Sequence, residues 1–222
     1  MHINVAIVTA NMGSFDPPSI ICDQVLPPDV GLSIFRFDDE NFKPRTKSMT
    51  SRLQARIPKM FGWEMAPGFD YYIWVDGSFS ILNPNTVAWY LDKINSYDAV
   101  FFSHPDRHTI KEEAEFIRKK IKDGNAYLVS RYENELIDEQ LNACFSDPRF
   151  KDNNLFATCS FMYKNNREMV SMLKEWWIHT SRYHVVDQLS IPYIASFYNV
   201  NILKDDIYHI PYLTYTRNKK GG

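Results

Sequence analysis

The feature that most limits how this chain can fold is an unbroken run of aromatic and β-branched residues at 71–75, Tyr-Tyr-Ile-Trp-Val. Such a run is typical of a strand buried on both faces of a sheet. Asp76 and Gly77 follow it directly. A carboxylate in this place is costly to desolvate unless a cation, hydrogen-bond donors or water meet it. Because ligands of open α/β sheets bind at the carboxyl ends of the strands, Asp76 is the first candidate site residue. Gly77 would let a ligand approach the backbone closely.

The Asp76-Gly77 pair has a simpler interpretation, because Asp-Gly is among the commonest turn sequences. Two observations favour a site. The strand before Asp76 is too apolar for a surface hairpin, and a second strand-like run at 78–82 continues beyond Gly77. A plain surface turn is therefore the weaker interpretation.

Other strand-like and helical segments follow one another along the 222 residues. The patterns predict strands at 3–9, 32–37, 98–103 and 155–163, with short strands at 202–203 and within 207–213. They predict helices at 46–61, 85–94, 110–120, 125–144, 167–180 and 189–197. No internal repeat, low-complexity tract or linker interrupts the chain, so we expect one domain over residues 1–216 and a flexible tail at 217–222.

The predicted helix at 46–61 carries a cluster of cations that includes Arg52, Arg56 and Lys59. A helix placed just before the acidic strand would bring these side chains to the same sheet edge, where a diphosphate would want such partners. The alternative is that they are solvated charges on an outer helix face. Pro58 should end this helix early or kink it, because proline lacks the backbone N–H.

Two further strands end in polar residues that could face a ligand. The first strand runs into Thr9 and Asn11, which are small and polar as a ligand-facing turn requires, and the strand at 98–103 runs into His104 and Arg107. Just beyond, Thr109 and Glu112 have the spacing of a capping box, which gives Glu112 a structural explanation.

The last candidates lie near the end of the chain. Asp187 and Gln188 stand just ahead of an apolar segment at 189–197. Asp187 could simply stabilise a helix N-terminus. His209 lies within the segment expected to form short strands, where a structural histidine is the simpler interpretation.

Bulk properties exclude few partners. The net charge of −2 gives no electrostatic case for nucleic acid or an anionic membrane. Three widely spaced cysteines, Cys22, Cys144 and Cys159, argue against a disulfide framework and fit a reducing cytoplasm. No apolar run approaches the length of a membrane span, and the N-terminus lacks the features of a signal peptide.

Four short motifs occur in order between about residues 45 and 197. They are Lys59 in the basic helix; Tyr72-Ile73-Trp74-Val75-Asp76-Gly77-Ser78; His104-Pro105-Asp106-Arg107 with Glu112-Glu113-Ala114; and Trp176-Trp177 followed by Arg182 and Asp187-Gln188-Leu189-Ser190. In this order the chain resembles the glycosyltransferase-like domain of plant pectin and mucilage glycosyltransferase-like proteins. It is more loosely similar to glycogenin-like enzymes of the GT-A type.

The resemblance implies a single α/β domain of the GT-A type, with a Rossmann-like, mixed and mostly parallel sheet flanked by helices. It implies a hexosyltransferase of polysaccharide biosynthesis that uses a nucleotide-diphosphate sugar, with a UDP-sugar favoured, and a glycan or lipid-linked acceptor. Asp76 would hold Mn²⁺ or Mg²⁺ against the diphosphate, with His209 as a further metal ligand by loose analogy. Asp187 would bind the donor sugar or face its anomeric carbon. The donor would also contact residues Thr9, Asn11, Arg52, Arg56, Lys59, Gly77, His104, Arg107 and Gln188.

The sequence departs from the glycogenin-like pattern at Ser78, where that pattern has a second aspartate, and a single carboxylate binds a divalent ion more weakly. A protein that binds nucleotide sugars or glycans without turnover is therefore one alternative. A sugar nucleotidyltransferase is another, although it would normally want a basic, glycine-rich phosphate loop, and residues 10–15 contain no Lys or Arg. For an inverting reaction, Asp187, Asp106 and Glu113 are all possible general bases.

Overall fold

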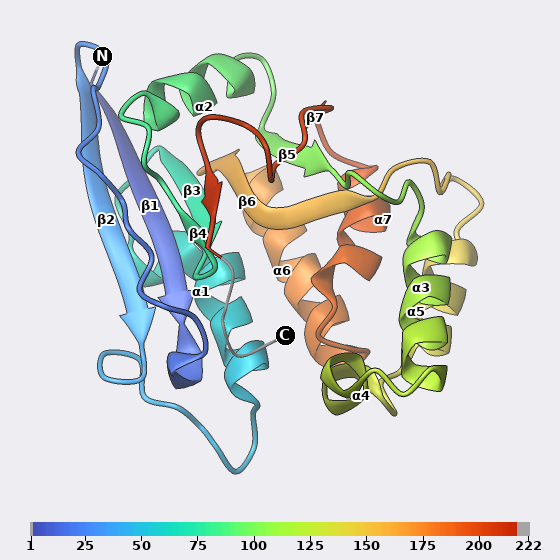
Figure 1. Ribbon diagram of the computed structural model, residues 1–222. Helices are drawn as coiled ribbons and strands as arrows, with labels where there is room; N and C mark the ends of the chain where they lie inside the picture. Colours follow the sequence, from blue (N-terminus) through green and yellow to red (C-terminus); the bar gives the residue numbers. More distant parts are fainter. Residues whose placement is uncertain (1, 217–222) are drawn as a thin grey trace.

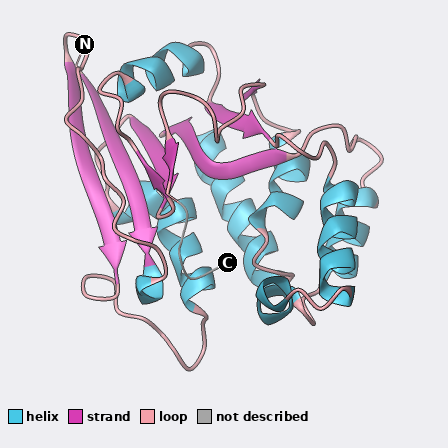
Figure 2. Cartoon of the chain, in the orientation of Figure 1, coloured by secondary structure: helices cyan, strands magenta, loops and turns pink. Residues whose placement is uncertain are grey.

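The computed structural model describes residues 2–216, and the predicted tail at 217–222 lies outside the described residues. Six strands of this part form the main sheet: β1 (Ile3–Asn11), β2 (Val30–Asp38), β3 (Tyr71–Asp76), β5 (Ala99–Ser103), β6 (Phe156–Lys164) and β7 (Val200–Leu203). A small second sheet pairs β4 (Phe79–Ser80) with β8 (Thr214–Tyr215). Figures 1 and 2 show the main sheet with helices on both sides.

The helices are α1 (Ser51–Met65), α2 (Thr86–Ile94), α3 (Ile110–Lys122), α4 (Ala126–Tyr132), α5 (Ile137–Phe145), α6 (Arg167–Arg182) and α7 (Ile191–Ala195). Two short 3₁₀ turns, η1 (Met12–Ser14) and η2 (Asp187–Leu189), complete the elements. None of the helices in residues 2–216 has the length and apolar character that crossing a membrane requires.

The main sheet is mixed and mostly parallel, as predicted. Its strand order is β2-β1-β3-β6-β5-β7. β1 is parallel to β2 and to β3, and β5 is parallel to β7, whereas β6 is antiparallel to both of its neighbours. Because the chain leaves β1 for β2 on one side and reaches β3 on the other, the strand order reverses at β1. This is the place where α/β sheets bind ligands.

The register of β1 against β3 fixes which side chains meet at this edge. Ala10 of β1 pairs with Asp76 of β3, so both strands end at the same level. Asn11 and Asp76 therefore reach the same edge of the sheet from neighbouring strands.

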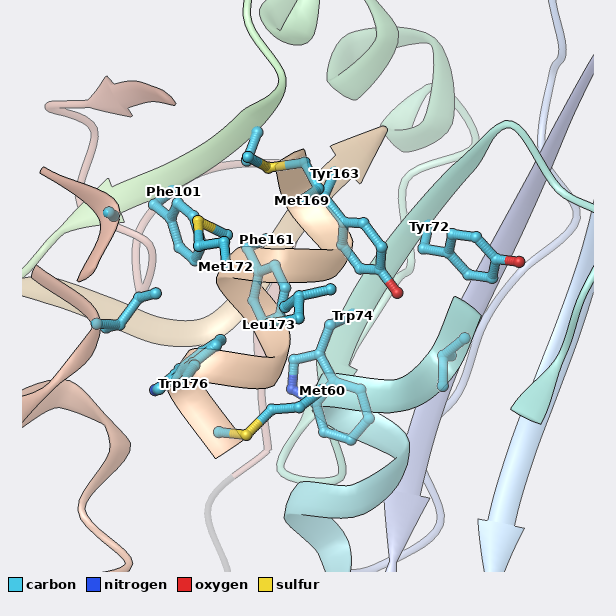
Figure 3. Packing of buried hydrophobic residues seen from close by; sticks show 14 of the residues in the cluster. Met60, Tyr72, Trp74, Phe101, Phe161, Tyr163, Met169, Met172, Leu173 and Trp176 are labelled. Atoms are coloured by element: carbon cyan, nitrogen blue, oxygen red, sulfur yellow. The ribbon is translucent and has the colours of Figure 1, made fainter. Parts of the chain in front are cut away.

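Alternate residues of β3 enter two different cores, as the two-residue period of a strand requires. Tyr72 and Trp74 pack with α1, α6 and α7, in a layer that also contains Met60 and Trp176. Figure 3 shows these four side chains. Residues 73 and 75 face the other layer, where α2, Phe79 and the segment around Ile207 and Leu213 cover the sheet. A third cluster joins α3 and α5 to η2.

The basic helix differs from its prediction at both ends. It begins at Ser51, capped by the Thr50 side chain, and continues through Pro58 to Met65. Of the two expected effects of Pro58, an early stop or a kink, the structure shows the kink, as non-helical backbone at Phe61 with φ −119° and ψ 23°. Gly62 follows, where an added Cβ would lie 3.3 Å from Tyr163 Oη and from Val8 Cγ2. The glycine thus lets α1 lie close against the sheet.

Two other predictions need correction, and one is confirmed. The helix expected at 125–144 is divided into α4 and α5, with Asn134 in the left-handed region at φ +65° between them. Residues 207–213 form turns rather than strands, and the pairing begins only at Thr214. The capping box of Thr109 and Glu112 at the start of α3 is present with both of its hydrogen bonds.

Candidate functional site

A cleft of about 1530 Å³ lies at the carboxyl ends of β1 and β3. Its walls come from the first turns of α1, from η1, from α4 and from the end of α6. Five of the predicted donor-binding residues line it: Asn11, Arg52, Arg56, Asp76 and Gly77. These elements lie in the lower half of Figure 1.

Asp76 reaches the cleft with a partly exposed side chain whose inner oxygen is already engaged. The indole Nε1 of Trp74 donates a hydrogen bond of 2.6 Å to Asp76 Oδ1. The ammonium of Lys59 lies 3.4 Å from the same oxygen. The carboxylate is 24% exposed, whereas the Lys59 side chain has no exposed surface. The strand residue two positions before Asp76 therefore helps to orient it.

Lys59 connects Asp76 with Asp187, which lies beneath the cleft. Lys59 Nζ is 2.6 Å from Asp187 Oδ2, and Arg56 Nε is 3.3 Å from that same oxygen. Thr158 of β6 donates a hydrogen bond of 3.2 Å to Asp187 Oδ1. The four charged side chains of Arg56, Lys59, Asp76 and Asp187, named here the ion network, thus join α1, β3 and η2.

Charge and burial compete within the ion network. Burial by itself would raise the pKa of Asp187, but Arg56 and Lys59 outweigh it and hold that pKa below its usual value. Burial would likewise lower the pKa of Arg56, but Asp187 and Asp76 raise it. Both groups are therefore charged at neutral pH, and the network contains two cations and two anions.

Aromatic side chains enclose the buried ammonium of Lys59. Its Nζ lies 5.7 Å from the ring centre of Trp74 and 5.6 Å from that of Trp176. Trp176 also donates a hydrogen bond of 3.0 Å from Nε1 to the backbone oxygen of Asp187. The side chain of Trp176 is fully buried and packs in the same core as Trp74 and Met60.

Gly77 is needed by the protein's own packing. An added Cβ would lie 3.0 Å from the backbone oxygen of Ala10 and 3.4 Å from Asp16 Oδ2. The close approach expected at this glycine is thus made by the end of β1 and by the loop that follows it.

Asp16 and Arg131 also line the cleft, and the sequence reasoning missed both. Burial raises the pKa of Asp16, and the neighbouring Asp76 raises it further, while Arg131 opposes the rise. The guanidinium of Arg131 lies over the rings of Tyr127 and Phe15, at 3.6 Å and 4.8 Å from their centres. The position of Asp16 just after the first strand was a usable signal. Arg131 comes from α4, and nothing in its local sequence indicates that α4 folds back over the cleft.

His104 and Arg107 form a separate cluster and are not among the residues that line the cleft. His104 Nδ1 accepts hydrogen bonds from the backbone N–H groups of Asp106 and Arg107. Arg107 forms an ion pair with Glu113 and lies over the ring of Phe116, 4.1 Å from its centre. Burial, and then Arg107, lowers the pKa of His104 to about 4.

The remaining candidates lie apart from the cleft surface. Thr9 is buried within β1, and Gln188 is not a lining residue. His209 is 82% exposed on its side chain and has Nδ1 2.7 Å from Asp206 Oδ2. Within residues 2–216, no group of three or more His, Cys, Asp or Glu side chains is arranged to hold a metal ion.

Comparison with known proteins gives a family match. The family model described as TOD1/MUCI70, glycosyltransferase-like domain, matches residues 46–206, which is well over half of the chain. No curated protein matches the chain.

Solved structures resemble the chain only at low identity. A glycosyltransferase involved in glycosylation of the major capsid of PBCV-1 has 9% identity and a TM-score of 0.46, over 92% of this chain and 82% of that one. Mouse xyloside xylosyltransferase 1 has 7% identity and a TM-score of 0.48, over 92% and 86%. A 4-diphosphocytidyl-2C-methyl-D-erythritol synthase from Anaerococcus prevotii has 11% identity and a TM-score of 0.41, over 94% and 91%. At these scores the neighbours carry no argument about the reaction.

Proposed function

We propose that this chain, which belongs to the TOD1/MUCI70 glycosyltransferase-like family, transfers a sugar from a nucleotide diphosphate to a glycan or lipid-linked acceptor. The observation that carries the proposal is the cleft at the ends of β1 and β3, which Asp76 lines together with Arg52 and Arg56 of α1. A hexose is the sugar, and a uridine diphosphate sugar is the donor to be tested first.

The diphosphate of the donor would lie against Arg52 and Arg56. Both line the cleft, and Arg131 of α4 lines it as well. Guanidinium groups bind phosphate oxygens in a bidentate manner, and these hydrogen bonds are strong because both partners are charged. As the glycosidic bond breaks, negative charge grows on the leaving nucleoside diphosphate, and cations held in place before the reaction stabilise it.

Aromatic residues offer a place for the nucleoside. Phe15, Tyr127 and Tyr215 all line the same cleft as the arginines. Planar bases stack on such rings, and stacking tolerates different bases. This arrangement supports a nucleotide donor and leaves the identity of its base to experiment.

Asp76 and Asp187 have different roles in this proposal. Asp76 is exposed to the cleft, so it can accept a hydrogen bond from a hydroxyl group of the donor. Asp187 is 3% exposed and is engaged by Lys59, Arg56 and Thr158. It therefore positions the two cations, and a direct contact of Asp187 with the sugar stays a prediction.

The residues at Asp76 do not fit the divalent cation that the sequence led us to expect. Asp76 Oδ1 already has Trp74 and Lys59 as partners, and Ser78 stands where a second carboxylate would be needed. His209 pairs with Asp206 instead. No step of the proposed reaction is therefore assigned to a metal.

The test is nucleotide binding, measured as thermal stabilisation by UDP, GDP, CDP and ADP. Ligand at about a hundred times its dissociation constant stabilises a protein by roughly 2.7 kcal/mol, which gives a clear shift in melting temperature. Arg56→Gln should reduce the shift. Arg167→Gln is the matched control, because Arg167 is exposed at the opposite end of α6 from the cleft.

Transfer itself needs a second measurement. Incubation with the UDP-sugar that binds should release UDP, slowly to water and faster when an acceptor glycan is added. Binding without any release would favour the non-catalytic alternative. Formation of UTP and a sugar phosphate when pyrophosphate is added to the UDP-sugar would favour the nucleotidyltransferase. The absence of a shift with all four nucleotides would refute the proposed function.

A further inference from the structure

We infer that the buried ammonium of Lys59 takes the place of a divalent cation at Asp76, so that nucleotide binding in this cleft needs no metal. The inference rests on the proposed function, because it concerns how the same cleft accepts a diphosphate. It assigns Lys59 as a positioning residue, since its side chain has no exposed surface and cannot touch the ligand itself.

The charges of the ion network balance without a metal. The ion network has two cations, Arg56 and Lys59, and two carboxylates, Asp76 and Asp187. Lys59 contacts both carboxylates, and Arg56 contacts Asp187. A divalent ion on Asp76 would add two positive charges beside an ammonium that lies 3.4 Å from the same carboxylate oxygen. Like charges this close repel strongly in a partly buried site.

Lys59 cannot move aside to make room for a metal ion. Its ammonium is held 2.6 Å from Asp187 and is enclosed by the rings of Trp74 and Trp176. A buried charge is stable only while it is paired. If the Asp76 carboxylate bound a metal ion, it would no longer pair with Lys59. Lys59 and Arg56 would then have only Asp187 as a partner, which would leave one buried positive charge uncompensated.

One cation of the network, Arg56, reaches the cleft without the help of a metal. Arg56 pairs with Asp187 through Nε and also lines the cleft. Lys59 neutralises Asp76, so an anionic diphosphate meets a carboxylate that is already paired. The arginines can then bind the phosphate oxygens without the repulsion that a free Asp76 would cause.

Asp16 offers the strongest competing arrangement. It lines the cleft, and it lies close enough to Asp76 for that carboxylate to raise its pKa. Asp16 and Asp76 with two phosphate oxygens could hold Mn²⁺, although the positive charge of Arg131 also acts on Asp16. The experiment must therefore distinguish Lys59 from a metal held by Asp16.

The test is a calorimetric titration of the full chain with UDP in excess EDTA and again with Mn²⁺. We expect the two dissociation constants to agree within about twofold, and a tightening of about tenfold or more with Mn²⁺ would overturn the inference. Loss of such a tightening in Asp16→Asn would assign the metal to Asp16. If UDP and the other nucleotides bind in neither condition, the proposed function itself fails, which is a different result.

A second arm tests Lys59 directly. Lys59→Met should weaken UDP binding in EDTA and make it respond to Mn²⁺, because the freed Asp76 then needs another cation. The double variant Lys59→Met/Asp76→Asn keeps one cation and one carboxylate, so it should bind UDP equally with and without Mn²⁺. If Lys59→Met alone binds UDP in EDTA with the dissociation constant of the wild type, the role assigned to Lys59 is wrong. If the single variant does not fold, the wild-type titrations and the charge-balanced double variant still decide.

Discussion

Replacement of Asp187 by asparagine tests the ion network most directly. The change keeps the size and one oxygen of the side chain, so Thr158 can still donate to Oδ1. It removes the charge that Lys59 meets at 2.6 Å and Arg56 at 3.3 Å. The two cations are then left with Asp76 alone.

The expected loss is large because the pair is buried. Removal of one partner from a buried ion pair costs about 3–5 kcal/mol, most of it the cost of an uncompensated buried charge. For a domain of this size, 1 kcal/mol shifts the melting temperature by about 2–4 °C, so Asp187→Asn should lower it by roughly 6–20 °C. Calorimetry at neutral pH measures this shift.

Asp92→Asn is the matched control for Asp187→Asn. Asp92 also pairs with a lysine, Lys93 at 3.0 Å, but its side chain is 73% exposed. Exposed pairs contribute little, so the control should melt like the wild type. The double variant Arg56→Gln/Asp187→Asn restores charge balance, and its loss should be smaller than the sum of the single losses.

The contribution of Asp187 to stability should also depend on pH, in a direction that its pKa determines. The pKa of Asp187 is lowered in the folded protein, so its stabilisation is complete above the unfolded pKa of about 3.9 and declines as pH falls through the folded pKa. The difference between wild type and Asp187→Asn should therefore shrink in strong acid. A melting temperature of Asp187→Asn equal to that of the wild type at neutral pH would refute the reasoning.

Two further predictions concern other parts of the cleft wall. Gly77→Ala should lower the free energy of unfolding by about 1–3 kcal/mol and weaken UDP binding, because the new Cβ would press on the Ala10 carbonyl at 3.0 Å. Denaturant unfolding measures the loss of stability, and Ser78→Ala is the neighbouring control. Equal stability of the two variants would contradict the packing argument. Burial lowers the pKa of His184 to about 4, so its neutral form stabilises the fold above pH 6.5, and that stability falls by about 2 kcal/mol between pH 7 and pH 5. Unfolding curves at the two pH values should show this decline in the wild type and less of it in His184→Gln.

The sequence was most informative where a local pattern determines the outcome. The apolar run before Asp76 predicted a buried strand that ends at a cleft, and the structure has this arrangement. Arg56, Lys59 and Asp187 were named as donor-binding residues, and they do lie together with Asp76. Their pairing with one another, rather than with a ligand, depends on how α1 and η2 meet beneath β3, which no local pattern records.

Long-range arrangement accounts for the rest. The reversed direction of β6 is set by the path of the chain through α3, α4 and α5, so the pattern of its own residues carries no trace of it. His104 and Arg107 follow a strand, as Asp76 does, yet β5 lies two strands away from β3 in the sheet. The break between α4 and α5 depends on one left-handed residue, Asn134, inside a stretch of helical composition.

The small β4–β8 sheet bears on how the cleft is assembled during synthesis. Thr216 donates a hydrogen bond to the backbone oxygen of Ser78, 138 residues earlier in the sequence. The neighbouring Tyr215 lines the cleft, as does Asn11 at the end of the first strand. Contacts between such distant segments form slowly, because a long loop must close before they contribute. When only the first strands and helices have left the ribosome, the residues of the ion network on α1 and β3 are therefore present. Asp187 and the cleft wall that contains Tyr215 are not yet made. The cleft becomes complete only when the last described strand joins β4.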